Sequence, residues 1–174
     1  MKPLRLFVLT LCVSVVSACG FKPMHAPTAF TGGASIYGDV AVVTPNNEKA
    51  DFLLKQALRG RLGDPATSTN GYTLTITPVL TRRTLGIGND DVGSRYDLVM
   101  QTNYSLTKGG NPDPVMVGDT RSVSTFAAPR DPYSTIAAQD NATEKLSNDS
   151  ADRILARLAQ YFANEADLQR AAVK

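Results

Sequence analysis

The sequence lacks several of the groups on which enzyme and metal sites depend. Its 174 residues include no tryptophan, one histidine and two cysteines. The histidine, His25, lies in a proline- and glycine-containing segment without periodicity, where neither a general base nor a metal ligand is expected. No G-x-S-x-G elbow, phosphate-binding loop or dinucleotide fingerprint is present. We therefore expect no catalytic residues, no metal site and no enzymatic activity.

A large excess of charge of one sign is also missing. The chain has 18 lysines and arginines against 16 aspartates and glutamates, and two of the basic residues, Lys2 and Arg5, lie at the start of the sequence. Without these two residues the body of the chain is neutral. Nucleic-acid binding needs a strong positive field. We therefore expect no nucleic-acid partner, and any recognition of anions must be local.

The apolar run at the start of the chain is too short to cross a bilayer. Leu6–Val16 falls well below the roughly 20 residues of a membrane-spanning helix. A basic start, a short apolar stretch and the small residues 16–18 before Cys19 are typical of a bacterial lipoprotein signal. We predict that residues 1–18 are removed and that Cys19 carries a diacylglycerol and an N-acyl chain. Gly20, rather than aspartate, follows the cysteine and favours transfer to the outer membrane. Cys12 leaves with the signal.

The rest of the chain is predicted to form one domain behind a tether. Residues 19–33 lack periodicity and form the lipidated tether, residues 34–165 form the domain, and the tail 166–174 is expected to fray. Alternating apolar residues predict strands, and apolar residues at helical spacing predict helices. The predicted elements are a strand at 35–44, a helix from Asn46 or Asn47 to Gly60–Gly63, strands at 72–77, 95–106 and 115–126, and a helix from Asp131-Pro132 to about Glu165.

This order, β-α-β-β-β-α, predicts an α+β two-layer sandwich. Three successive strands joined by short turns favour a meander, so we expect two helices packed on one face of a four-stranded, mainly antiparallel sheet. The opposite face would then be rich in Thr, Ser, Asn and Gln. Pro78 predicts an edge or a bulge in its strand because proline cannot donate to the ladder. Within the long helix, residues 148–150 could mark a kink or a second cap.

Four arginines are the candidate binding residues. Arg82, Arg83 and Arg95 flank a glycine-rich turn, and Arg121 lies on the neighbouring predicted strand. Arginine suits phosphate because its guanidinium donates forked, charge-assisted hydrogen bonds. The alternative is a solvated hairpin end, which spacing alone favours. The acids that would neutralise it are Asp90, Asp91 and Asp97.

Aromatic residues on the predicted strands allow two interpretations. Tyr96, Tyr104 and Phe126 could line an apolar groove for acyl chains. At strand spacing, however, aromatic residues more often belong to the core. The sequence leaves this choice open, with the core favoured.

Three segments and the element order resemble a known family. The Cys-Gly-Phe-Lys-Pro opening at 19–23, the Arg-Tyr-Asp-Leu strand start at 95–98 and the Arg-Ser-Val-Ser segment at 121–124 are similar to those of the lipopolysaccharide-assembly lipoprotein family LptE, especially its alphaproteobacterial members. The resemblance implies an outer-membrane lipoprotein on the periplasmic side that plugs the lumen of the LptD barrel, helps it assemble and binds lipopolysaccharide. It also implies that basic residues contact lipopolysaccharide, which raises the interest of the four arginines.

Two other classes of function remain as alternatives. The first is an auxiliary lipoprotein of an ABC-type envelope lipid transporter, which would co-purify with a transporter instead of a barrel. The second is a lipoprotein hydrolase, which the lack of a nucleophile–base pair disfavours.

Overall fold

The computed structural model describes residues 40–62, 71–87, 93–109, 111–128 and 131–172. All of them belong to one unit, Ala34–Lys174. The predicted signal, the tether with Cys19 and His25, and the turn acids Asp90 and Asp91 lie outside the described residues. The elements in order are β1 (Val40–Val43), α2 (Lys49–Leu62), β2 (Tyr72–Ile87), β3 (Gly93–Lys108), β4 (Pro114–Ala127) and α3 (Pro132–Ala172).

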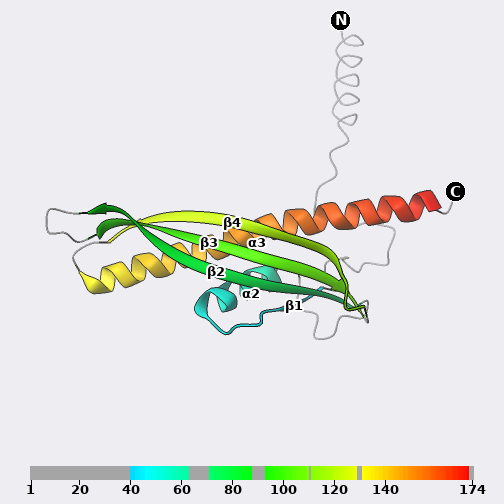
Figure 1. Cartoon of the computed structure of the whole chain (residues 1–174), viewed down its shortest axis with the longest axis horizontal. Helices are drawn as coiled ribbons and strands as arrows, with labels where there is room; N and C mark the ends of the chain where they lie inside the picture. The colour runs from blue at the N-terminus through cyan, green and yellow to red at the C-terminus, as the bar shows by residue number, and fades with distance from the viewer. Residues whose placement is uncertain (1–39, 63–70, 88–92, 110, 129–130, 173–174) are drawn as a thin grey trace, which may run out of the picture. The chain divides into compact units, whose positions relative to one another are not determined.

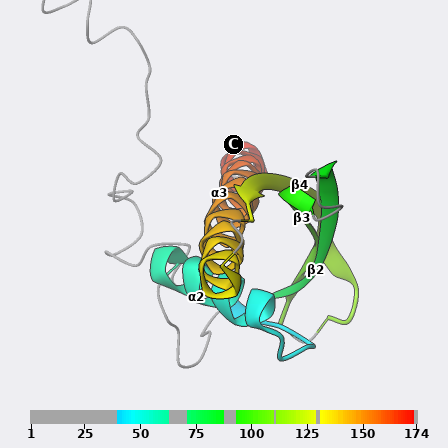
Figure 2. The same ribbon diagram turned by 90° about the vertical axis from the view of Figure 1, so that its left-hand side faces the viewer.

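The sheet has the predicted mixed, mainly antiparallel character. Its strand order is β1-β2-β3-β4, with β1 parallel to β2 and the other neighbours antiparallel. The three long strands form the meander expected from their short connections. Both helices lie on one side of this curved sheet (Figures 1 and 2). The prediction of a β-α-β-β-β-α sandwich is therefore confirmed.

Strand β2 is internal at one end of the sheet and an edge strand along the rest. β1 pairs only with Tyr72–Thr75, so no strand lies beside the following part of β2 in the described sheet. Pro78 lies in this second part, opposite Thr102 of β3. A missing N–H is tolerated where a strand has only one neighbour. This explains how β2 runs unbroken through the proline from Tyr72 to Ile87.

Alternation along the strands separates a helix-covered face from an uncovered one. On β2, Tyr72, Leu74 and Ile76 are buried on the covered face, whereas the threonines between them are partly exposed. The covered face carries two apolar clusters. The main cluster comprises Val40, Val42, Leu54, Leu58, Leu62, Tyr72, Leu74, Ile76, Tyr104, Leu106, Ala151, Ile154, Leu158 and Phe162. The hairpin-side cluster comprises Ala50, Leu98, Met100, Phe126, Ala142 and Leu146.

Helix α3 begins where the sequence predicts. The Asp131 carboxylate accepts hydrogen bonds from the Ser134 backbone N–H at 3.0 Å and the Tyr133 N–H at 3.4 Å, which makes it the N-cap before Pro132. Hydrogen bonds from Ser134, first from its hydroxyl and then from its backbone, lower the pKa of Asp131 below its ordinary value.

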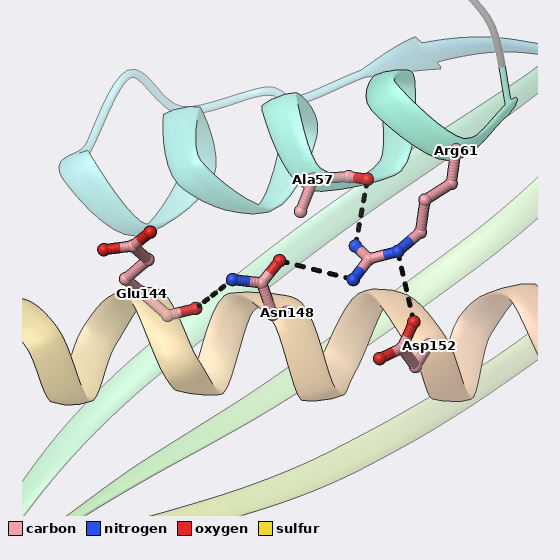
Figure 3. Close-up of polar contacts among 5 residues, drawn as sticks. All are labelled: Ala57, Arg61, Glu144, Asn148 and Asp152. Carbon is pink, nitrogen blue, oxygen red and sulfur yellow. Dashed lines mark hydrogen bonds and ion pairs between the residues drawn. The ribbon is translucent and has the colours of Figure 1, made fainter.

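Residues 148–150 neither end α3 nor form a second cap. The helix is continuous through them, and the Asn148 side-chain amide donates to the carbonyl of Glu144 at 3.1 Å. From α2, the Arg61 guanidinium donates to Asn148 Oδ1 at 3.4 Å and pairs with Asp152 at 3.2 Å (Figure 3). Asn148 therefore bonds within its own helix and to α2.

The C-terminal end of α3 corrects the sequence prediction. The helix continues to Ala172 instead of ending near Glu165. Alanine, leucine, glutamine and arginine in this segment are good helix formers. Arg170 also pairs with Asp167 at 3.0 Å, three residues away on the same helix.

Candidate functional site

Three of the four candidate arginines gather at the hairpin end of the sheet. In the β2–β3 register Arg82 lies opposite Leu98 and Arg83 opposite Asp97. Arg95 lies opposite Gly86, next to a register shift. All three arginines are exposed. The expected grouping of these cations near one end of the sheet is therefore observed, although strand alternation divides them between its two faces.

Arg82 lies on the helix-covered face against an aromatic pair. Its guanidinium carbon is 5.0 Å from the centre of the Tyr96 ring, a cation–π distance. Tyr96 in turn stacks on Phe126, with ring centres 5.6 Å apart and an angle of 26° between the planes. This contact holds a positive charge at the border of the hairpin-side cluster, next to apolar surface.

Arg83 lies on the uncovered face beside an acid that is already bonded. Its partner in the register, Asp97, accepts a hydrogen bond from the Thr125 hydroxyl at 2.6 Å. Of the acids expected to neutralise the hairpin end, Asp97 is therefore beside the arginines. A phosphate bound at Arg83 would therefore lie near this carboxylate, whereas Arg82 lies opposite Leu98.

Arg121 does not join the other three. The β3–β4 register places it opposite Gln101, about 20 Å along β3 from Arg95 at the usual rise of a strand. Its neighbour on the same face of β4 is Asp119, two residues away. The strand order alone had placed Arg121 near the other three arginines, and the antiparallel register shows that it lies apart from them.

The three aromatic residues considered for an acyl groove belong to two different places. Phe126 belongs to the hairpin-side cluster and the partly buried Tyr96 packs against it, whereas Tyr104 belongs to the main cluster. Tyr104 and Phe126 are buried. The three rings therefore do not line one common groove, and the core interpretation is the better description of Tyr104 and Phe126.

A polar cluster at the opposite end of the sheet was not predicted. The Tyr72 hydroxyl lies 3.1 Å and 3.3 Å from the two carboxylate oxygens of Glu165, and Lys108 Nζ is 3.4 Å from the same carboxylate. Burial raises the pKa of Tyr72 above its ordinary value. These residues join β2, β3 and α3, so their role is to fix the helix to the sheet. The three residues are far apart in the sequence, so no local pattern indicates that they meet.

One buried acid lies in the first turn of α2. Asp51 is 1% exposed, and neither of its carboxylate oxygens has a hydrogen-bond partner among the described residues. Burial is the main cause that raises its pKa above the ordinary value of 3.8. Sequence reasoning missed Asp51 because an acid in a first helical turn is normally an exposed residue that favours the helix dipole.

The uncovered face of the sheet mixes polar side chains with valines. Its central rows run across β2, β3 and β4. Taken in that order, they are Thr77–Asn103–Asp119, Val79–Gln101–Arg121 and Thr81–Val99–Val123. Four of these nine residues carry a hydroxyl or amide group, two are charged and three are valines, of which Val79 and Val123 are exposed. The face is therefore less polar than the surface of Thr, Ser, Asn and Gln that the sequence predicted.

The described residues supply neither a metal site nor a membrane-spanning helix. No three of their histidines, cysteines, aspartates and glutamates converge to hold a metal ion. Nor does any described helix have the length and apolar character needed to cross a bilayer.

The fold places the chain in a class of bacterial lipoprotein domains. It is similar to a suspected lipoprotein from Caulobacter crescentus CB15, with a TM-score of 0.62, 25% identity, and coverage of 74% of this chain and 93% of the other. It shares its fold with rare lipoprotein B from Shewanella oneidensis, with a TM-score of 0.57, 16% identity, and coverage of 73% and 98%. For a minor lipoprotein from Acinetobacter baumannii the TM-score is 0.55, the identity 11%, and the coverage 74% and 95%.

The family of the chain follows from its sequence. Residues 37–158 match the family LptE, described as lipopolysaccharide-assembly. The chain belongs to this family, and the resemblance drawn from the three short segments and the element order is confirmed. A comparison with curated protein sequences gives no match. Membership supports a role in lipopolysaccharide assembly as an envelope lipoprotein.

Proposed function

We propose that this protein is an outer-membrane lipoprotein that plugs the LptD barrel, assists its assembly and binds lipopolysaccharide during insertion into the outer leaflet. The observation that carries the proposal is the LptE family match over residues 37–158. In this proposal the acyl chains on Cys19 anchor the domain on the periplasmic side of the outer membrane. The protein acts by binding and has no catalytic step.

The uncovered sheet face supports the role as a plug. Side chains of Thr77, Gln101 and Asn103 lie on this face, where no described helix covers them. Barrel lumens are polar, so a domain that fills one has to present hydrogen-bonding groups without a large excess of charge. The polar positions of the uncovered face have this character, and the exposed Val79 and Val123 lie among them.

The arginines at the hairpin end support the binding of lipopolysaccharide phosphates. Arg82 and Arg83 are adjacent on β2, and Arg95 lies in the next rungs of β3. Guanidinium groups bind phosphate with paired, charge-assisted hydrogen bonds. Arg82 adds a specific feature, because its cation rests on Tyr96 beside apolar surface. An anionic amphiphile presents the same combination of phosphate and hydrocarbon.

The barrel partner is tested by affinity purification of the tagged, full-length lipoprotein from membrane extracts. We expect a large outer-membrane barrel protein to co-purify. Recovery of an ABC-type transporter instead would replace the proposal with the auxiliary-lipoprotein function. Recovery of neither would refute the plug.

The arginine site is tested by the affinity of the full-length protein for lipopolysaccharide. We expect simultaneous Arg82→Ala, Arg83→Ala and Arg95→Ala substitutions to weaken binding at least about tenfold, since each charge-assisted contact contributes about 1.5–3 kcal/mol. A control with the same loss of charge replaces three exposed arginines of α3, namely Arg153, Arg157 and Arg170. Equal affinity in both variants would remove the hairpin arginines from the site. Arg121→Ala is measured separately because Arg121 lies apart.

A further inference from the structure

A band of hydroxyl side chains separates the two apolar clusters. It runs between the sheet and α3, and we call it the hydroxyl seam. Its members are Thr102, Thr120, Ser122, Ser147 and Ser150. Two further buried hydroxyl residues, Ser124 of β4 and Thr143 of α3, continue it toward the hairpin end. Thr102 of β3 lies between Met100 of the hairpin-side cluster and Tyr104 of the main cluster on the covered face. The core is therefore two apolar units joined through polar contacts.

The hydroxyl seam is only partly hydrogen-bonded. Ser150 donates across the interface to the Ser122 hydroxyl at 3.1 Å. By contrast, the buried hydroxyls of Thr102 and Thr120, which are partners in the β3–β4 register, have no partner among the described residues. A buried polar network that is only partly satisfied holds its two sides together less firmly than an apolar contact. Separation along the seam is thus less costly than separation within either cluster.

The backbone of α3 is weakened at the same place. The Thr143 hydroxyl bonds to the carbonyl of Gln139 at 2.8 Å, and the Ser147 hydroxyl bonds to the carbonyl of Thr143 at 2.9 Å. Serine and threonine hydroxyls that bond to the carbonyl four residues earlier slightly destabilise and bend helices. Two such bonds in consecutive turns lie immediately before Ser150. This part of α3 has the properties of a hinge.

The part of α3 before the hinge makes small apolar contacts with the sheet. We call Pro132–Leu146 the lid. It contributes Ala142 and Leu146 to the hairpin-side cluster, whereas Ile154, Leu158 and Phe162 enter the main cluster after the hinge. Leu146 is fully buried, but Ala142 buries far less apolar surface than an isoleucine or phenylalanine side chain does. The lid is the less firmly held part of the helix.

The exposed side chains of the lid and its ion pair with α2 are consistent with a weakly held segment. Tyr133 and Ile136 are 83% and 60% exposed, so these large side chains do not hold the lid to the sheet. Asp140 forms a 2.6 Å ion pair with Lys49 of α2, but the two side chains are 48% and 59% exposed. Exposed ion pairs contribute little stability. Figure 1 shows α2 beneath the middle of the sheet and the start of α3, in yellow, at the hairpin end. Helix α2 contributes one residue, Ala50, to the hairpin-side cluster.

We propose that the lid separates from the sheet by local opening that ends at Ser147–Ser150, while the main cluster stays folded and the lid stays joined to β4 at Ala127. Opening uncovers Leu98, Met100 and Phe126 without breaking the contacts of Ile154 and the residues that follow it. Proteins open locally where few apolar contacts hold a segment, and the seam defines where this segment ends.

Opening of the lid is also coupled to Arg82. Phe126 lies in the cluster beneath the lid, Tyr96 stacks on Phe126, and Arg82 rests on Tyr96. When the lid opens, Phe126 is exposed, and the Tyr96 ring that contacts Arg82 then stacks on an exposed residue. A phosphate held by Arg82 in the closed form should therefore favour closure, because coupling between two events is reciprocal. This second step rests on the proposed binding of lipopolysaccharide, whereas the opening itself does not.

Hydrogen exchange of the full-length lipoprotein in lipid nanodiscs, without ligand, tests the opening. We expect backbone amides of Ile136–Leu146 to exchange at least about tenfold faster than those of Ile154–Phe162. Equal protection of the two stretches would mean that α3 opens as one piece and would overturn the proposal.

Two serine substitutions three residues apart test the hinge and the seam separately. Ser147→Ala removes a bond within the helix and should slow exchange in the lid. Ser150→Ala removes the bond to Ser122 and should speed it. In both variants exchange of Ile154–Phe162 should stay unchanged. A change of the same size in both stretches would show an effect on the stability of the whole domain and would contradict a local hinge.

Added lipopolysaccharide tests the coupling. We expect it to slow exchange of Ile136–Leu146 in the wild type and to have a smaller effect in Arg82→Gln. If lipopolysaccharide binds and the lid exchange does not change, the coupling is refuted. If lipopolysaccharide does not bind at all, the proposed function fails, while the ligand-free difference between the two stretches of α3 still decides whether the lid opens.

Discussion

The two ends of the sheet are held in different ways. At the α2 end, leucines of α2 and large apolar residues of α3 close over β1, β2 and β3, and Arg61 joins the two helices (Figure 3). At the hairpin end, α3 contributes Ala142 and Leu146 to the cluster, and α2 contributes only Ala50 among the described residues. The main cluster, with its leucines of α2 and large side chains of α3, is expected to hold the fold, whereas the smaller cluster is able to open.

The difference shows where stability and the candidate site are located. Arg82, Arg83 and Arg95 lie at the hairpin end, which is the end with the smaller apolar cluster. Segments that move during binding come from the less stable part of a domain. In this molecule the main cluster stabilises the sheet at one end, and the three arginines lie at the other end, outside that cluster.

The same leucine-to-alanine change at each end should give the largest difference. Leu158 and Leu146 both lie on α3, with 0% and 1% exposure, but they belong to different clusters. Removing a buried leucine side chain costs about 2–5 kcal/mol, depending on how well the site collapses. We expect Leu158→Ala to lie at the upper end of this range and Leu146→Ala at the lower end, as measured by urea unfolding.

The result also bears on how each end unfolds. Leu146→Ala should speed hydrogen exchange mainly before Ser147, whereas Leu158→Ala should affect the whole domain. Equal losses of unfolding free energy with the same exchange pattern would show that the two ends are not distinct.

A glycine at the edge of the main cluster should give the second largest effect. Gly118 lies opposite Tyr104, and a methyl group added there would come within 2.6 Å of Tyr104 Cζ. The ring is buried and has to move, so we expect Gly118→Ala to lower the unfolding free energy by about 1–3 kcal/mol.

The control for this change is a glycine of α2. A methyl group at Gly60 meets nothing within 4 Å, and alanine favours a helix more than glycine, so Gly60→Ala should raise the unfolding free energy by about 0.5–1 kcal/mol. Thermal or urea unfolding should show a lower unfolding free energy for Gly118→Ala and a higher one for Gly60→Ala. A neutral Gly118→Ala would mean that Tyr104 is not held in place by the main cluster.

The smallest effect is a pH dependence from Asp51. Its folded-state pKa is raised above 3.8, mainly by burial, so the folded protein binds the proton more tightly than the unfolded chain does. This contribution to stability is present below pH 3.8 and is lost as the pH rises through the folded-state pKa. We expect Asp51→Asn to lack this loss, so that the variant gains stability relative to the wild type as the pH rises.

Asp149 is the control for the sign of this effect. Its pKa is lowered, first by a hydrogen bond from the Ser122 hydroxyl, so its contribution to stability is lost as the pH falls below 3.8. Asp149→Asn should therefore lose stability relative to the wild type as the pH rises. Urea unfolding across the acid range measures both, and parallel curves for Asp51→Asn and the wild type would contradict the assignment to Asp51.

Much of the fold could be predicted because its signals are local. Alternation from Tyr72 to Thr77 predicts a half-buried strand, and Asp131-Pro132 predicts the start of a helix. Both predictions are confirmed. The extension of β2 through Pro78 could not be derived with the same certainty, because it depends on how short the neighbouring strand β1 is.

Less of the candidate site could be predicted, because it depends on the register between neighbouring strands and on which face of the sheet each side chain occupies. Arg82 and Arg83 are neighbours in sequence, yet one contacts Tyr96 on the covered face and the other lies beside Asp97 on the uncovered face. Arg121 lies on the expected strand but far from the cluster along it. The role of Cys19 as the lipid anchor remains a prediction from the sequence.

The sequence by itself determined the elements, their order and the absence of a large net charge, because periodicity, caps and composition are properties of short segments. Only the tertiary structure decided that the core divides at a hydroxyl seam and that Asp51 is buried. It also placed Tyr104 apart from Tyr96 and Phe126. These features depend on which residues of distant segments face each other, and a one-residue change of register or a small shift of α3 would alter them without changing any local pattern.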